Sequence, residues 1–75
     1  MDDNFARHKN FVAVASTVTP GKWWVFSEYS SSIYAIGIIH YVSGDYAVTA
    51  KFVGAPDEFL GDAKTLLDAL QIFGG

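Results

Sequence analysis

The stretch Ile33–Val53, IYAIGIIHYVSGDYAVTAKFV, decides how the rest of the chain is interpreted. It predicts two β-strands joined by a turn at Ser43-Gly44-Asp45, because apolar and β-branched residues flank residues typical of turns. The first strand is apolar on both of its faces, and one helix can cover only one face of a sheet. The second face is therefore the first place to look for a binding surface.

The register of this hairpin assigns its two faces. With Gly44-Asp45 as a two-residue turn, the odd-numbered residues of 33–41 share a face with the even-numbered residues of 46–52. Gly37 then pairs with Phe52. Small residues such as Gly37 leave room for close packing, so we expect a helix to cover this face.

Residues 57–74 predict that helix. Asp57 is the expected N-cap, and Gly74 lies just past the expected end. Apolar residues recur at helical spacing along one side, while charged and polar residues fill the other. The apolar side consists of Phe59, Ala63, Leu66, Leu67, Leu70 and Phe73.

The N-terminal half supplies the remaining strands. Residues 22–29, KWWVFSEY, predict a strand that places Trp23 and Trp24 on opposite faces, one in the core and one on the far face. Residues 10–19 predict a strand, with a helix as the alternative. Residues 1–9 are expected to be a frayed or short helical N-terminus.

The expected fold is therefore a single small α+β domain over residues 1–75. It consists of an antiparallel three- to four-stranded β-sheet (meander) with a C-terminal amphipathic α-helix packed on one face. A chain of 75 residues has a small core, and its 51% hydrophobic content is consistent with a dense core, self-association or both.

Composition excludes several classes of site. The chain has no cysteine, which rules out disulfides and thiolate metal sites, and its two histidines are too few for an all-protein zinc site without carboxylates. The sequence contains no G-x-S-x-G nucleophile motif and no Walker-type or Rossmann-type glycine motif. We expect no enzymatic activity, no metal and no cofactor, and we interpret His40 as a packing residue on a strand.

Charge and hydropathy bear on partners and location. The net charge of −3 with five Lys and Arg does not provide the basic patch that nucleic-acid binding requires. If residues 10–19 are helical instead, the element order becomes α-β-β-β-α, which is also the order of double-stranded RNA-binding domains. The second helix of that class should begin with lysines, whereas acidic residues stand at that position here. Met1-Asp2-Asp3 lacks a basic n-region, and no apolar run reaches the roughly 20 residues of a membrane span. We expect a cytoplasmic protein without direct nucleic-acid or membrane contacts.

Two surfaces are candidates for protein binding. The first is the sheet face away from the helix, where aromatic and apolar residues exceed what the helix can cover. Its predicted members are Trp23, Trp24, Tyr34, Ile36, Ile38 and His40. The second is an acidic face of the predicted helix, consisting of Asp57, Glu58, Asp62 and Asp68. Acids at a helix N-terminus are also stabilised by the dipole alone, so this second set has an ordinary structural explanation.

These features favour a non-enzymatic small protein-binding module that modulates or inhibits a larger protein partner. An anti-defence protein of a phage or mobile element, similar to anti-CRISPR proteins, fits the small size and acidity. One alternative is a structural homo-dimer or oligomer that self-assembles through its aromatic sheet face. Another is a binder of small molecules or peptides.

Overall fold

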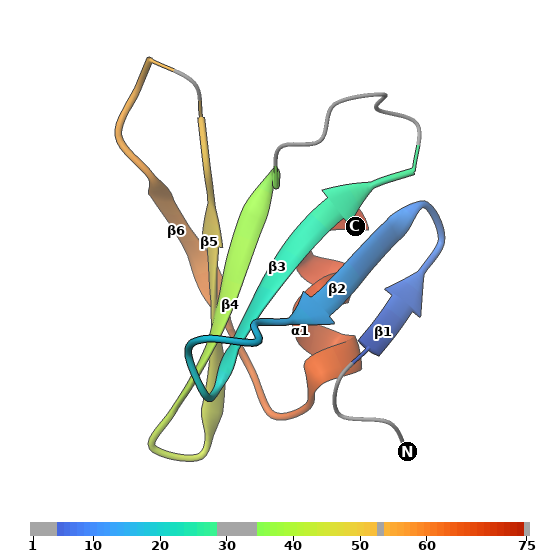
Figure 1. The fold of residues 1–75 in the computed structure, drawn as a ribbon, viewed down its shortest axis with the longest axis vertical. Helices are drawn as coiled ribbons and strands as arrows, with labels where there is room; N and C mark the ends of the chain where they lie inside the picture. Colours follow the sequence, from blue (N-terminus) through green and yellow to red (C-terminus); the bar gives the residue numbers. More distant parts are fainter. Residues whose placement is uncertain (1–4, 29–34, 53, 75) are drawn as a thin grey trace.

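The computed structural model describes residues 5–28, 35–52 and 54–74. This part of the chain forms six strands followed by a helix (Figure 1). Each strand pairs antiparallel with its neighbours in chain order, so the sheet is a meander. The predicted α+β class with an antiparallel sheet and a C-terminal helix is confirmed. The elements are β1 Phe5–His8, β2 Phe11–Ala15, β3 Lys22–Ser27, β4 Gly37–Val42, β5 Asp45–Ala50, β6 Glu58–Ala63 and α1 Leu66–Gly74.

The predicted number of strands was too low. The sheet has six strands, and the additional ones are the edge strands β1 and β6. Their sequences, FARH and EFLGDA, contain one phenylalanine each and no β-branched residue, so intrinsic preference gave only a weak indication of a strand. They are extended because they pair with β2 and β5. For residues 10–19 the strand interpretation is right over Phe11–Ala15.

The central hairpin keeps its predicted faces but not its predicted pairing. Its turn is Ser43-Gly44, with φ of 52° and 88°, as a type I′ turn requires. Gly37 consequently pairs with Ala50 rather than with Phe52. This difference is a shift of two residues. Because side chains alternate along a strand, a two-residue shift leaves every residue on the same face.

The helix begins eight residues beyond the predicted start at residue 58. It spans Leu66–Gly74, and residues 58–63 form β6. Thr65 caps the helix: its hydroxyl oxygen accepts a hydrogen bond from the Asp68 amide at 3.1 Å. Thr65 and Asp68 have the spacing of a capping box. The prediction of Asp57 as the N-cap did not take this sequence pattern into account.

We expect Thr65→Ala to lower the free energy of unfolding by about 0.5–2 kcal/mol, because the Asp68 amide would lose its acceptor. Chemical denaturation would measure the change. Thr65→Ser keeps the hydroxyl and is the matched control, so its stability should stay close to that of the unmodified chain. Equal losses in both variants would show that the hydroxyl is not what matters at this position.

The helix packs on what we call the inner face of the sheet. A row of mostly small residues crosses this face through all six strands, and α1 lies against it. At Gly37 an added Cβ would lie 2.2 Å from Cζ of Phe73, so only glycine allows this approach. The row consists of Ala6, Ala13, Val25, Gly37, Ala50 and Glu58.

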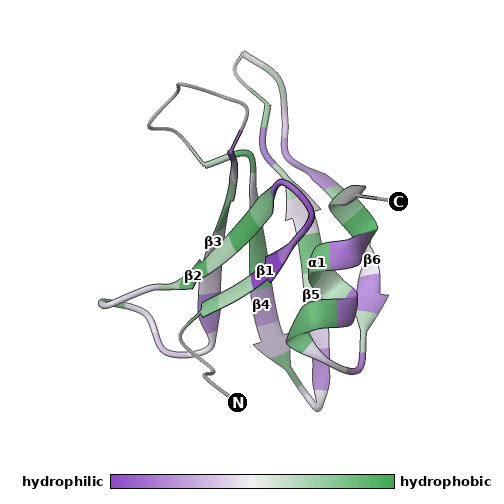
Figure 2. Ribbon diagram, turned by 90° about the vertical axis from the view of Figure 1, so that its right-hand side faces the viewer, coloured by the Kyte–Doolittle hydropathy of each residue, from purple (hydrophilic) through white to green (hydrophobic). Residues whose placement is uncertain are grey.

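The sheet curls around the helix. α1 contacts β1 and β2 as well as β4, β5 and β6. Figure 2 shows α1 in front of β5, with β1 on one side of it and β6 on the other, and with β2, β3 and β4 to its left. The core between sheet and helix includes Trp23, Val25, Ile39, Val48, Leu66 and Leu70. The helix therefore covers one face, and the opposite face remains without a partner element in the described part of the chain.

Candidate functional site

The face of the sheet away from α1, which we call the outer face, carries a continuous row of side chains. The register aligns one residue from each of the six strands across the sheet. All are apolar except the threonine. We call this set the apolar row; its members, in strand order, are Phe5, Val14, Trp24, Ile38, Thr49 and Phe59.

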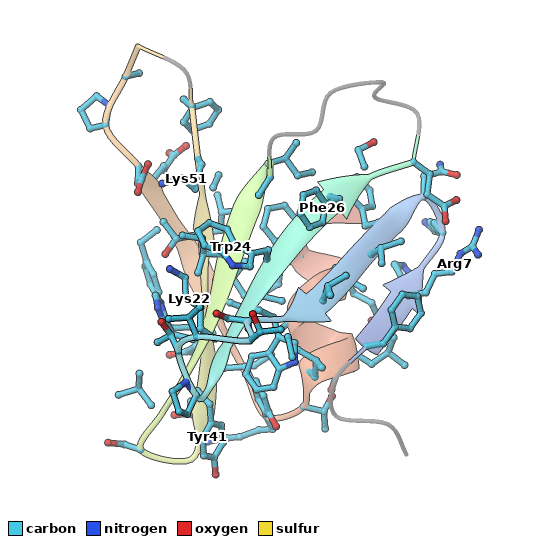
Figure 3. All side chains as sticks on the ribbon, viewed as in Figure 1. Arg7, Lys22, Trp24, Phe26, Tyr41 and Lys51 are labelled. Carbon is cyan, nitrogen blue, oxygen red and sulfur yellow. The ribbon has the colours of Figure 1, made fainter. Side chains whose placement is uncertain are left out.

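The apolar row is covered in the middle and exposed at both ends. Ile38 is only 8% exposed, whereas Phe5 and Phe59 are 48% and 64% exposed. Trp24 is half-buried, and Phe26 lies beside it on the same strand and the same face. Figure 3 shows Trp24 and Phe26 in front of the sheet while α1 lies behind it. An extended apolar surface of this kind is unusual for a folded domain that has no partner.

Lys22 lies over Trp24. Its Nζ is 4.1 Å from the centroid of the Trp24 ring, which is a cation–π contact. Lys22 also belongs to a second row on the outer face, one step along the strands from the apolar row. We call it the charged row; its members are Lys22, His40, Ala47 and Asp62.

Ion pairs lie near the margins of the outer face. Arg7 of β1 donates to Glu28, just past the end of β3, at 2.7 Å, and Lys51, just past the end of β5, donates to Asp57, just before β6, at 3.2 Å (Figure 3). Each cation is therefore matched by a carboxylate. An exposed pair contributes about 0–1 kcal/mol to stability, so these pairs make the margin polar more than they hold the fold together.

A further ion pair joins the central hairpin to the segment between β6 and α1. Lys64 donates a hydrogen bond to Asp45 at 2.5 Å. The hydrogen bond and the negative charge of Asp45 raise the pKa of Lys64 above its usual value. Because the folded-state pKa is raised, the stabilisation that this ion pair gives the folded state is present at neutral pH. It would be lost as the pH rises through the pKa of Lys64. The contact lies outside both rows of the outer face.

The predicted sheet-face residues divide between the two sides of the sheet. Trp24, Ile38 and His40 lie on the outer face, as expected. Trp23 is buried against the helix instead, which settles which tryptophan is in the core. Ile36 also packs against the core and leaves the predicted set. Tyr34 lies outside the described residues.

The predicted acidic helix face does not exist as one surface. Asp57 precedes β6, Glu58 and Asp62 belong to β6, and only Asp68 lies in α1. Glu58 and Asp62 are also on opposite sides of the strand, since they pair with Ala50 and Ala47 of opposite faces. The prediction failed because it extended the helix into β6.

Phe5, Val14 and Phe59 are outer-face residues that the sequence interpretation missed. Val14 belongs to the alternating run VAVAS, from which its face could have been derived once the pairing with β3 was known. Phe59 was assigned to the apolar side of a helix, where it would have been buried. In β6 it is instead the most exposed member of the apolar row.

Comparison with known proteins gives no relative: no family model matches, and no match was found among curated proteins or solved structures. Within residues 5–28, 35–52 and 54–74, no three His, Asp or Glu side chains are arranged to hold a metal ion. No helix in this part of the chain has the length and apolarity needed to cross a membrane. The outer face is thus the feature on which a functional proposal can be built.

Proposed function

We propose that this chain is a non-enzymatic protein-binding module whose outer face docks onto a larger protein and modulates it. The observation that carries the proposal is the apolar row, which extends across all six strands and ends in exposed phenylalanines. Tryptophan and other large apolar residues at the centre of a surface are typical of residues that dominate binding energy. Trp24 occupies that position.

The margin of the outer face supports a protein partner in particular. Protein interfaces commonly combine an apolar centre with a polar rim. Here Trp24 and Ile38 are central, while the Arg7–Glu28 and Lys51–Asp57 pairs lie outside them. Since these cations are already neutralised, they offer little to phosphate groups, and this favours protein over nucleic acid.

The small size, the net charge of −3 and the apolar surface suit an inhibitor or regulator that acts by covering a site on its target. An anti-defence protein of a phage or mobile element would be one such regulator. Its target would present an apolar surface of similar extent, because burial of the apolar row would provide most of the driving force. Cytoplasmic location remains part of this proposal.

Phe59→Asp should reduce binding of the partner at least about tenfold, because it places an unpaired charge in an apolar interface. The partner would first be captured with the unmodified chain from its native host and identified, and the affinities of the variants would then be measured with the purified partner. Phe59 is 64% exposed, so the fold should survive the substitution.

Val18→Asp is the matched control. Val18 is 86% exposed and precedes β3 in the turn region, away from the apolar row. The same change of side chain there should leave the affinity within about twofold of the unmodified chain, since surface substitutions away from special features have small effects. Equal affinities for Phe59→Asp, Val18→Asp and the unmodified chain would refute the proposed interface.

A further inference from the structure

Two charges of opposite sign that form no ion pair in the described part of the chain stand in one row of the outer face. Lys22 lies over Trp24, and Asp62 acts on Lys64 only through its charge. Lys22 is on β3 and Asp62 on β6, and both belong to the charged row. Within the residues that the structure describes, neither forms an ion pair, whereas Arg7, Lys51 and Lys64 each do. They are separated by three strand spacings, about 14 Å, so they cannot reach each other within one chain.

The positions of these two charges are related by a simple symmetry. A two-fold axis parallel to the strands, between β4 and β5, exchanges β4 with β5 and β3 with β6. Because the sheet curls around α1, the outer face is convex, and two copies facing each other across this axis would meet first at β4 and β5. The long side chain of Lys22 would extend across the wider gap beside them toward the partner's Asp62. Because an isologous interface uses the same patch twice, one complementary pair within a patch produces two pairs across it.

The apolar row obeys the same symmetry. Trp24 of one copy would face the partner's Phe59, and Ile38 would face the partner's Thr49. The exposed ring of Phe59 would then be buried on the half-buried ring of Trp24, an aromatic contact worth about 0.5–1.5 kcal/mol beyond its area. Large residues meet small ones in the charged row as well, where His40 would face the partner's Ala47.

We propose that a second copy of this chain occupies the outer face of the free protein, forming a two-fold symmetric dimer in which two sheets pack face to face. Sheets packed in this way keep their strand directions within about 30° of each other, which the axis parallel to the strands satisfies. The inference rests on the proposed function because it uses the same face. A larger partner and a second copy would exclude one another, so the free chain would be a dimer and the bound chain a monomer.

Charge reversal tests the pairing directly. Light scattering during size-exclusion chromatography should give twice the 8.2 kDa chain mass for the unmodified protein. Lys22→Asp or Asp62→Lys should raise the dimer dissociation constant at least about tenfold, as expected for a close charge pair across an interface. The double variant Lys22→Asp/Asp62→Lys restores opposite charges and should return the constant to within about threefold of the original.

Controls separate the pairing from general effects. Lys9→Asp reverses an exposed charge in the turn between β1 and β2, outside the predicted contact, and should leave the dimer unchanged. Asp62→Asn is nearly isosteric and should weaken the dimer in the same direction as Asp62→Lys, which keeps the test valid if Lys22→Asp fails to fold. Circular dichroism would establish folding in each case.

A monomeric unmodified chain at all concentrations would overturn the dimer, as would a folded double variant that does not recover. These outcomes are distinguishable from failure of the proposed function. A monomer that still loses its larger partner on Phe59→Asp would leave the outer face as an interface for that partner alone. A dimer disrupted by charge reversal, with capture of the larger partner unaffected by Phe59→Asp, would leave self-association as the role of this face.

Discussion

Truncating Trp23 to alanine is expected to lower the free energy of unfolding by about 3–5 kcal/mol, the cost of removing a large buried aromatic side chain. Trp23 is 8% exposed and belongs to the core beneath α1. Its ring centroid lies 5.5 Å from that of Tyr46 in a tilted arrangement, so the variant would also lose an aromatic contact.

This loss is large compared with what a chain of this length has available, roughly 4–11 kcal/mol in total. The Trp23→Ala chain should therefore be partly unfolded at room temperature or close to it. Urea denaturation followed by circular dichroism would measure the change. The measurement should be made in dilute solution, where the chain is monomeric, because self-association stabilises the folded state by mass action.

Trp24→Ala is the matched comparison, since it makes the same chemical change one residue along the chain. Trp24 is half-buried on the outer face, and its contacts include the Nζ of Lys22. We expect it to cost less than half as much as Trp23→Ala in the monomer. Equal losses at the two positions would mean that both tryptophans belong to one core and that the outer face is not a free surface.

Gly37→Ala is expected to destabilise the fold by about 1–3 kcal/mol, although it adds only a methyl group. The added Cβ would lie 2.2 Å from Cζ of Phe73 and 2.9 Å from the backbone oxygen of Thr49. The Phe73 ring can turn away at some cost in packing. The Thr49 oxygen can move only if β5 moves away from β4, and that would disturb the hairpin itself.

The contribution of Phe73 can be isolated with a double-mutant cycle. Phe73→Ala removes the ring that the new Cβ would meet, so Gly37→Ala should cost less in that background than in the unmodified chain. The difference is expected to be about 0.5–3 kcal/mol, the usual range for residues in direct contact. A Gly37→Ala chain as stable as the unmodified one would contradict the close packing of α1 on this strand.

The faces of the central strands could be predicted from sequence because strict alternation leaves little choice. Adjacent residues such as Trp23 and Trp24 must point to opposite sides of a strand. The face of the hairpin that packs on α1 was also correct, since the shift in register was even. What alternation could not provide was which tryptophan faced the helix, because that depends on the pairing of β3 with its neighbours.

The edge strands could not be predicted for a physical reason. β1 and β6 each contain one phenylalanine and no β-branched residue, so their own preference for extended structure is weak and pairing with β2 and β5 supplies the rest. In β6 this failure extended the helix by two turns and produced an acidic helix face that does not exist. The capping pair Thr65 and Asp68 would have placed the start of α1 correctly, but the Pro56-Asp57 sequence resembled a start as well.

The candidate site was affected by the same limits. Ile38 and His40 could be assigned to one face because they lie on a central strand, and one of the two tryptophans was expected beside them. Phe5 and Phe59 could not, because their strands were not recognised. Without them the outer face looks like a small patch around one tryptophan. With them it is a row that crosses the whole sheet, and its self-complementarity becomes visible.

Whether the outer face is an interface is tested most directly by the molar mass of the Trp24→Ala chain in solution. Light scattering should show a folded monomer at concentrations where the unmodified chain is a dimer, because Trp24 supplies the centre of the apolar row. Circular dichroism on the same sample would show that the fold is retained. A folded Trp24→Ala chain that associates as strongly as the unmodified chain would contradict the assignment of this face as the binding surface.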